Sequence, residues 1–292
     1  MIPFCKIGDK FFAHKLRCLT QCKILGVIPE KFLEEEDKVM KIIPIKLSVT
    51  TCYFVRTNSH YVLIDTGYEE DWDLFLVQIQ KANIKLSEIS HIILTHHHDD
   101  HCGLLANILK ENPSIQVVMS YLCEDLISVG ENDRTHGGGL LNKRVAFLIQ
   151  LKQFYVSLKL GKKVSKSNNL KFKPYILRDC DIVINGETEL RNIGIPIDGK
   201  IIETPGHSVD SISILFYDGD CIVGDAAARM LKFADLKNCV IFICNMDEYY
   251  KSWQKIIAAG AKKIFPAHGK PFSVDKLKNN IGKNKAKDLI PY

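Results

Sequence analysis

The stretch THHHDDHCG, residues 95–103, places four histidines and two aspartates at six consecutive positions. So dense a run of titratable groups suits neither the apolar face of a helix nor that of a strand. Imidazole and carboxylate groups are, however, ligands that zinc and its neighbours prefer. A short peptide cannot close the coordination shell of a metal by itself. The run therefore predicts a metal site that is completed by other segments of the chain.

Single histidines and aspartates lie at three other places where an apolar segment stops. His207 follows KIIE in a Pro-Gly turn, Asp225 follows CIVG, and His268 follows KKIFPA. Small residues beside each of them let the backbone come close to a ligand. Because binding loops gather at strand ends in layered α/β folds, these three residues are the candidates to complete the site.

Two segments of the chain repeat one plan: a hairpin that ends at an aspartate, a helix, a strand and a histidine loop. The first hairpin covers residues 52–67 and ends at Asp65; the second covers 211–227, turns at Asp218-Gly219 and ends at Asp225. Alternating strand and helix patterns indicate α/β or α+β layers. We expect two similar halves that supply acids and histidines to a shared edge.

The residues between the halves exceed what a simple connection requires. They include a glycine-rich turn and a helical run over 142–160, in which one broad apolar stripe serves either as core or as a roof over the site. The stripe consists of Phe147, Leu148, Leu151, Phe154, Tyr155 and Leu158. We predict a single domain over residues 1–292, with a helical cap inserted at about 120–175.

Composition sets the outer limits. A formal net charge of +5 is far from that of a dedicated nucleic-acid binder and argues against a nucleic-acid partner. No run of about 18 apolar residues predicts a membrane span, and the first residues, MIPFCKIGDK, do not resemble a secretion signal. The ten cysteines are mostly scattered singly, Cys18 and Cys22 being the one close pair, and indicate reduced thiols and a cytoplasmic location.

The spacing His96-x-His98-x-Asp100-His101, followed by His207, Asp225 and His268, resembles the metal-binding set of the metallo-β-lactamase superfamily. The sequence LIDTG at 63–67 resembles that family's early strand-to-aspartate turn. The resemblance runs from about residue 45 to 270. It implies the α+β class and a four-layer αβ/βα sandwich, with two sheets back to back and helices outside.

The resemblance also implies two divalent metal ions, zinc as the first choice and iron or manganese as alternatives. One metal would be bound by three of the residues: His96, His98 and His207. The other would be bound by Asp100, His101 and His268, with Asp225 bridging the pair. This frame leaves His97 outside the ligand set. Asp65 either holds a ligand histidine by hydrogen bond or is an ordinary turn acid.

Two metals about 3.5–4 Å apart can share a water and lower its pKa from about 15.7 to near 7. We therefore expect attack of a metal-bridging hydroxide on a carbonyl or phosphoryl centre. The expected catalytic residues are Asp225, which holds the metals together, and Asp100, which delivers a proton directly or through a water. The sequence thus predicts a dinuclear metal-dependent hydrolase of a small-molecule ester, lactone or thioester, with a homodimer left open.

Several branches of the superfamily remain as alternatives. Lactonase and glyoxalase II branches keep this ligand set, but the lactonases carry a tyrosine three residues after the bridging aspartate, where this chain has Ala228. Phosphodiesterases of the same fold and iron-dependent persulfide dioxygenases are the other enzymes considered. A non-catalytic binding module is disfavoured because every ligand is present. The roles of His136, Arg229 and the lysine run at 159–173 stay open.

Overall fold

The apolar segments of the first half form a six-stranded sheet with the order β1-β2-β3-β4-β5-β7. The computed structural model describes residues 42–133, 135–160 and 171–291, which fall within one compact unit. The strands of the first sheet are β1 (Ile42–Lys46), β2 (Thr51–Arg56), β3 (Tyr61–Ile64), β4 (Ile89–Ile93), β5 (Gln116–Ser120) and β7 (Ile182–Ile184). β1, β2 and β3 pair antiparallel, whereas β3, β4, β5 and β7 pair parallel.

The second half builds a six-stranded sheet on the same plan, with the order β14-β13-β11-β10-β9-β8. Its strands are β8 (Thr188–Glu189), β9 (Gly199–Glu203), β10 (Ile212–Phe216), β11 (Asp220–Gly224), β13 (Lys263–Pro266) and β14 (Phe272–Ser273). The hairpin β10–β11 is antiparallel and β11 pairs parallel with β13, just as β2–β3 is a hairpin and β3 pairs parallel with β4. The expected repeat is therefore present in the fold.

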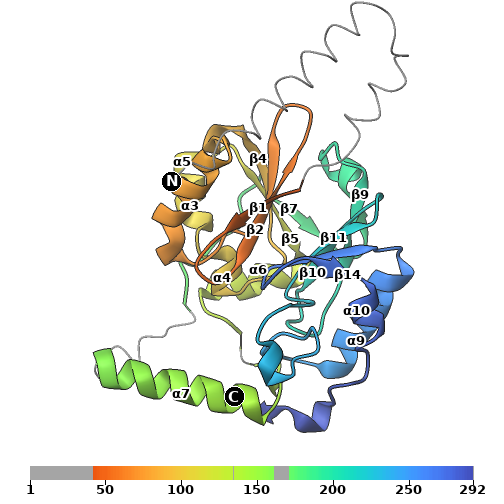
Figure 1. The fold of residues 1–292 in the computed structure, drawn as a ribbon. Coiled ribbons are helices and arrows are strands. Elements are labelled where there is room, and N and C mark those ends of the chain that lie inside the picture. The colour runs from red at the N-terminus through yellow and green to blue at the C-terminus, as the bar shows by residue number, and fades with distance from the viewer. Residues whose placement is uncertain (1–41, 134, 161–170, 292) are drawn as a thin grey trace, which may run out of the picture. The chain divides into compact units, whose positions relative to one another are not determined.

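Helices cover the outer face of each sheet (Figure 1). α3 (Trp72–Lys81) and α5 (Leu105–Glu111) bury their apolar sides in the core of the first sheet, and α9 (Met246–Ala258) and α10 (Asp275–Lys278) do so at the second. In α9 the buried residues Tyr249, Trp253 and Ile256 recur at helical spacing. Asn245 caps this helix by accepting from two backbone N–H groups of its first turn.

The two sheets lie back to back and touch through aromatic side chains. The rings of Tyr53 in β2 and Phe265 in β13 meet edge to face at 5.9 Å, and the Tyr53 hydroxyl donates to the carbonyl of Pro266 at 2.7 Å. The predicted α+β class and αβ/βα sandwich are confirmed. None of the helices in the described part of the chain combines the length and apolar character needed to span a bilayer.

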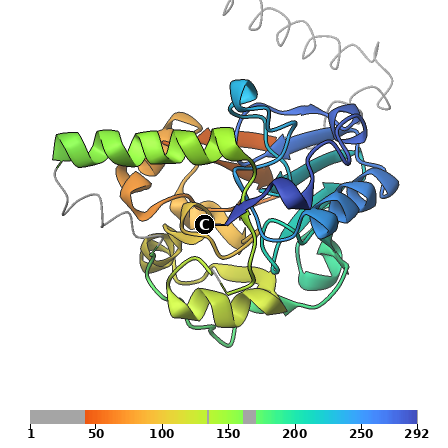
Figure 2. The same ribbon diagram turned by 90° about the horizontal axis from the view of Figure 1, so that it is seen from below.

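The inserted segment contains α6 (Tyr121–Val129), β6 (Gly139–Leu140) and the long helix α7 (Lys143–Leu160), which runs along the outside of the body (Figure 2). β6 is the central strand of a small antiparallel sheet between β12 (Phe242–Ile243) and β15 (Ile290–Pro291). The boundaries of the cap and the single domain over 1–292 stay predictions, because residues 1–41 and 161–170 lie outside the described residues.

The apolar stripe expected on α7 is only partly buried. Phe147 and Leu151 are 63% and 51% exposed, so these two residues neither pack in the core nor cover the metal site. The inward side of the helix is taken instead by Val145, which is buried, and by Ile149, four residues on. The apolar run is broader than the one face that α7 can bury. The side chains of Phe154, Tyr155 and Leu158 and most of the 159–173 lysine run lie outside the described residues.

Candidate metal centre

The structure brings all seven predicted ligands together where strands of both sheets end. Residues 96–101 follow β4 and include the short helix α4 (Asp99–Cys102). The other three ligands follow strands of the second sheet: His207 after β9, Asp225 after β11 and His268 after β13. Each sheet thus supplies a share of one cluster, as the repeated plan led us to expect.

Thr95 and Gly224 let the two sheets approach at this point. The backbone N–H of Ile212 donates to the carbonyl of Thr95 at 2.8 Å, which ties β10 to the histidine loop. Gly224, with a φ of 49°, packs so closely that a Cβ atom there would lie 2.4 Å from Thr95 Oγ1. Only glycine leaves that space open, and the residue that follows it is Asp225.

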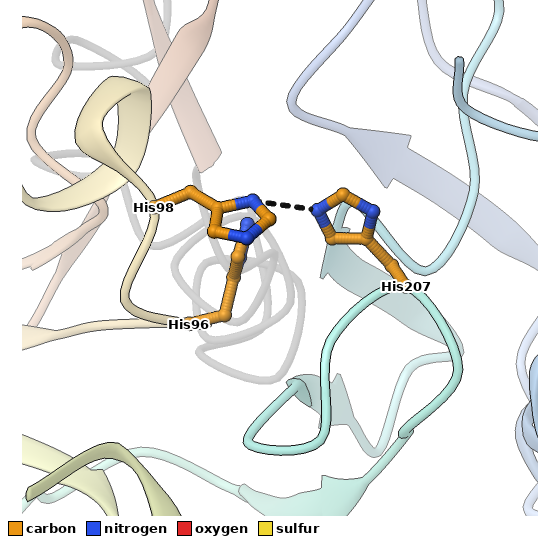
Figure 3. A group of neighbouring side chains, drawn as sticks. All are labelled: His96, His98 and His207. Carbon is orange, nitrogen blue, oxygen red and sulfur yellow. Dashed lines mark hydrogen bonds between the residues drawn. The ribbon is translucent and has the colours of Figure 1, made fainter. Parts of the chain in front are cut away.

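The first predicted group, His96, His98 and His207, is drawn in Figure 3. His207 Nε2 lies 2.9 Å from His98 Nδ1, and the ligand atoms of all three lie within 4.8 Å of one another. His207 Nδ1 donates to the carbonyl of Phe242 at 2.9 Å, so the Nε2 lone pair faces the cluster. Burial lowers the pKa of all three imidazoles below the ordinary value, which favours the neutral form that a metal requires.

The second predicted group, Asp100, His101 and His268, is rich in negative charge. His268 Nε2 lies 3.1 Å from Asp100 Oδ2 and 3.2 Å from Asp225 Oδ1. Burial opposes a charge on His268, but the two carboxylates outweigh it and raise its pKa to about 10. The same competition, with Asp100 as the strongest opposing charge, raises the pKa of His101 well above its ordinary value. The carboxylates of this group therefore attract positive charge.

Asp225 lies between the two groups. One of its oxygens is 3.5 Å from His207 Nε2 and the other is 3.5 Å from His101 Nε2. Its backbone is fixed from behind by α9, because the Tyr249 hydroxyl donates to the Asp225 carbonyl at 3.0 Å. This is the position that a bridging ligand would occupy.

Three buried atoms of the cluster make no hydrogen bond: His96 Nε2, His101 Nε2 and Asp225 Oδ1. A buried polar atom that makes no hydrogen bond costs about 1–3 kcal/mol, so a native fold seldom keeps three of them in one place. His96, His101 and Asp225 themselves form a group whose ligand atoms lie within 4.8 Å of one another. The donor set therefore fits divalent metal ions, and the assignment of each ligand stays a prediction.

Asp65 supports this cluster from below, so the structure favours the first of its two interpretations. Its carboxylate accepts from His101 Nδ1 at 2.8 Å, and from the backbone N–H and the hydroxyl of Thr95, both at 2.8 Å. The hydrogen bond to His101 directs the Nε2 atom toward Asp225. Asp65 adopts a φ of 60°, a left-handed conformation that aspartate tolerates better than most residues.

Replacing Asp65 by asparagine should weaken metal binding without removing a ligand. Loss of a partner that orients a ligand histidine typically lowers metal affinity about 10- to 100-fold. Titration of the metal-free protein with zinc and a competing chelator measures this change. Asp71→Asn, a buried aspartate that accepts from Ser48 outside the cluster, is the matched control. Equal affinity in Asp65→Asn and the wild type would contradict the role of Asp65.

His97, which the spacing leaves outside the ligand set, holds the site together from another side. Its Nδ1 lies 3.0 Å from Asp210 Oδ1, its backbone N–H donates to Asp210 Oδ2 at 2.8 Å, and its Nε2 accepts from the N–H of Asp133. Asp210 follows His207 in the same loop, so the pair joins the histidine loops of the two sheets. Sequence reasoning missed Asp210; an aspartate between apolar Val209 and the strand β10 was the available signal.

A pocket of about 200 Å³ opens beside the cluster and is lined by five of the predicted ligands. Its remaining polar lining comes from Tyr68, Asp99, Asn132 and Asp133. The rest of its wall is apolar: Val49, Leu140, Ile149, Met230, Val240, Ile241 and Phe242. Tyr68, which follows the LIDTG turn directly, was not among the predicted residues.

Two residues with open roles are placed differently from the ligands. Arg229, considered as an anion contact, donates from Nη1 to the carbonyl of Pro271 and does not line the pocket. His136 is 2.5 Å from Asp133 Oδ2 near the pocket, with its side chain 47% exposed. A contact of His136 with substrate stays a prediction. Ala228 is buried, so that position presents no substrate-binding side chain.

Comparison with known proteins agrees with the fold. The family model for the metallo-beta-lactamase superfamily matches residues 45–268, and the chain belongs to this superfamily. The chain is 23% identical to the "Beta-lactamase-like protein 2 homolog" of Caenorhabditis elegans, over 77% of this chain and 58% of that relative. It thus spans little more than half of that relative's length. It is 25% identical to the "Probable metallo-hydrolase YqjP" of Bacillus subtilis, over 82% of this chain and 73% of that one.

A shorter match has a higher identity. The chain is 38% identical to the "Atrochrysone carboxyl ACP thioesterase AacuM" of Aspergillus aculeatus, over 24% of this chain and 22% of that one. Among solved structures, a superfamily member from Sulfolobus tokodaii has a TM-score of 0.53 at 20% identity, covering 84% of this chain and 85% of that chain. A subclass B3 metallo-beta-lactamase of Bradyrhizobium japonicum has the same TM-score at 18% identity, with coverages of 79% and 75%. The predicted family is confirmed.

Proposed function

We propose that this protein is a dinuclear, zinc-preferring hydrolase that cleaves small thioesters, with esters and lactones as the next candidates. The observation that carries the proposal is a set of three buried atoms that make no hydrogen bond, on His96, His101 and Asp225. They belong to a cluster of seven predicted metal ligands beside an apolar pocket. The names of thioesterase relatives support the choice of thioester over lactone. The apolar wall suits the hydrocarbon part of an acyl group.

The residues of the chain divide the work of the reaction. His96, His98 and His207 would hold one metal ion, Asp100, His101 and His268 the other, and Asp225 would hold both. Metal ions in such a centre supply Lewis acidity and lower the pKa of water toward neutrality. The side chain of Asp100 reaches the pocket, with its carboxylate 3.1 Å from His268. It is therefore placed to accept the proton that the attacking water loses and to pass it to the leaving group.

Tyr68 supplies a further hydrogen-bond donor on the pocket wall. Within the described part of the chain its hydroxyl makes no hydrogen bond, and burial together with the nearby Asp100 carboxylate raises its pKa above the ordinary value, so it stays protonated. A neutral hydroxyl facing the pocket can donate to the substrate carbonyl oxygen as negative charge develops there. In this position it would take the role that lactonases give to a tyrosine three residues after the bridging aspartate, where this chain has Ala228.

Tyr68→Phe is expected to lower kcat roughly a hundredfold while leaving the metal content unchanged, because only the donor is lost. Steady-state hydrolysis of a short thioester and metal analysis of the same preparation measure the two quantities. Tyr121→Phe, a half-exposed tyrosine outside the pocket, is the control. Unchanged kcat in Tyr68→Phe would remove the hydroxyl from the mechanism.

Metal analysis of anaerobically purified protein, combined with a substrate panel, tests the proposed function. We expect two zinc ions per chain and turnover of thioesters faster than that of aryl esters, lactones or phosphodiesters. Full metal loading without turnover of any of the four would overturn the proposal. One iron per chain with oxygen uptake on glutathione persulfide would replace it by a sulfur dioxygenase.

The cysteines bear on the setting of the reaction. All seven cysteines in the described residues are free thiols, and five of them are buried. Free thiols persist in reducing compartments, which supports the proposal of a cytoplasmic location.

A further inference from the structure

A second cleft, distinct from the metal pocket, is lined by positive charge. It has a volume of about 480 Å³ and lies between the start of α7, the loop around residue 235 and the segment that leads into β15. Five cationic side chains line it against two carboxylates, Asp235 and Asp288. The five are Lys143, Arg144, Lys237, Lys283 and Lys287.

Most of these cations have no ion-pair partner. Of the five, only Lys237 forms an ion pair, with Asp235 at 3.3 Å. The other four, Lys143, Arg144, Lys283 and Lys287, have no carboxylate within 4.0 Å among the described residues. Elsewhere on the surface, lysines such as Lys200 and Lys251 do find carboxylates. Four unpaired cations around one concavity make a favourable place for an anion, because like charges held together gain most from a counter-charge.

The walls of the cleft are tied together rather than loosely apposed. Asn142, at the start of α7, caps the N–H of Val145 and donates from its amide to the carbonyl of Ala234. Asn284 donates from its side-chain amide to the carbonyl of Leu236, and from its backbone N–H to the Tyr250 hydroxyl oxygen, 2.9 Å away. All three walls of the cleft are therefore held at fixed positions.

Two exposed aromatic rings lie beside the cations. Lys143 and Arg144 also line a neighbouring cavity together with Phe147 and Phe233, whose exposed fractions are 63% and 70%. Aromatic side chains beside cations can stack on a nucleobase while the cations bind its phosphates.

The small sheet β12-β6-β15 connects this cleft to the metal pocket. Phe242 in β12 lines the pocket and accepts the hydrogen bond of His207, β6 leads into α7, and β15 is preceded by Lys283 and Lys287. Neighbouring strands lie about 4.8 Å apart, so the outer strands are only about 10 Å apart. The metal pocket and the basic cleft thus border the same small sheet.

We propose that the basic cleft binds the phosphate-bearing nucleotide end of a thioester substrate, whose acyl end enters the metal pocket. The ligand class is a thiol joined through a flexible arm to an adenine nucleotide, as in coenzyme A. This inference rests on the proposed thioester hydrolysis, but the binding of the free thiol does not depend on turnover. Phe147 and Phe233 receive the base, and the four unpaired cations receive the phosphates.

Calorimetric titration of the metal-loaded protein with coenzyme A tests the cleft directly. We expect binding that weakens with added salt, and a Kd at least about tenfold higher in Lys283→Glu/Lys287→Glu, because two attractions become repulsions. Lys81→Glu/Lys276→Glu makes the same change in net charge on exposed residues outside the cleft and should stay within about twofold of the wild type. Phe233→Ala should raise the Kd about fivefold or more through lost stacking.

Two further ligands separate the sources of the phosphate. Pantetheine, which lacks phosphate, should bind no tighter in the wild type than in the cleft variant. If 4′-phosphopantetheine binds as tightly as coenzyme A, the nucleotide contributes nothing to binding, and the assignment of the base to Phe147 and Phe233 is overturned. If coenzyme A binds more tightly than 4′-phosphopantetheine, the cleft recognises the nucleotide itself. Coenzyme A binding that is absent, or equal in the cleft and control variants, overturns the proposal.

Kinetics separate this inference from the proposed function. The cleft variant should raise KM for an acyl-coenzyme A and leave the hydrolysis of the matching N-acetylcysteamine thioester unchanged. Equal hydrolysis of both thioesters by every variant would support the proposed hydrolase function and overturn the role of the basic cleft in substrate binding. Charge-dependent coenzyme A binding without hydrolysis of either thioester would do the reverse.

Discussion

Asp225→Ala is expected to lose both metal ions and to lower the rate of hydrolysis by at least roughly a thousandfold. The carboxylate lies between the two histidine groups, with 3.5 Å to His207 and 3.2 Å to His268, so its removal takes one ligand from each. It also leaves the buried His101 and His268 with one opposing charge fewer. Removal of a single preorganised electrostatic contact in an active site commonly costs 10²–10³ in rate, and here the metals go with it. Metal analysis and thioester hydrolysis are the measurements.

Asp218→Ala is the matched control for this experiment. Asp218 belongs to the same β10–β11 hairpin, at the exposed turn rather than at the ligand end. It should keep both metals and full activity. Thermal unfolding of Asp225→Ala should match that of wild-type protein treated with a chelator, which separates loss of metal from loss of fold. Full metal content and activity in Asp225→Ala would contradict the bridging role.

Asp210→Ala is expected to lower the free energy of unfolding by about 3 kcal/mol, even with a chelator present. Asp210 is 1% exposed and accepts both the backbone N–H and the ring nitrogen of His97. Burial opposes the charge on Asp210, but His97 outweighs it and lowers the pKa of this carboxyl. Removing Asp210 leaves the backbone N–H and the ring N–H of His97 buried without an acceptor, and each such unsatisfied donor costs about 1–3 kcal/mol. Urea unfolding followed by fluorescence measures the change.

Asp198→Ala provides the comparison, since Asp198 pairs with Arg191 on the surface and both side chains are more than half exposed. Exposed pairs contribute little, so this variant should unfold at the wild-type urea concentration. If Asp210→Ala is as stable as Asp198→Ala, the His97–Asp210 pair does not join the two halves.

The ligand cluster was predictable because each of its members follows an apolar segment, which is visible in the local sequence. His207, Asp225 and His268 each stop an apolar run, and parallel strands bring such stops to one edge whatever the details of packing. The repeated hairpin, helix and strand plan set the sandwich for the same reason. The α9 helix, with Tyr249, Trp253 and Ile256 on one face, shows the periodicity that sequence carries well.

The features that the sequence did not predict depend on contacts between residues that lie far apart along the chain. Asp210 acquires its role only when His97, more than a hundred residues away, packs against it. The exposure of Phe147 depends on which side of α7 meets the body, which an all-round apolar helix leaves undetermined. The basic cleft needs Lys143 and Lys283 side by side, and that follows from β15 pairing with β6 rather than from either segment.

Because the predicted ligands are divided between two sheets, the stability of the fold would depend on the supply of the metal. Four of the predicted ligands come from one half and three from the other, so bound ions would hold the two halves together where Thr95 and Gly224 are in contact. An ion that binds only the folded chain stabilises it by an amount that grows with the logarithm of its free concentration, about 2.7 kcal/mol at a hundred times the Kd. Cells starved of the metal would therefore hold fewer intact copies of this protein, as well as less active ones.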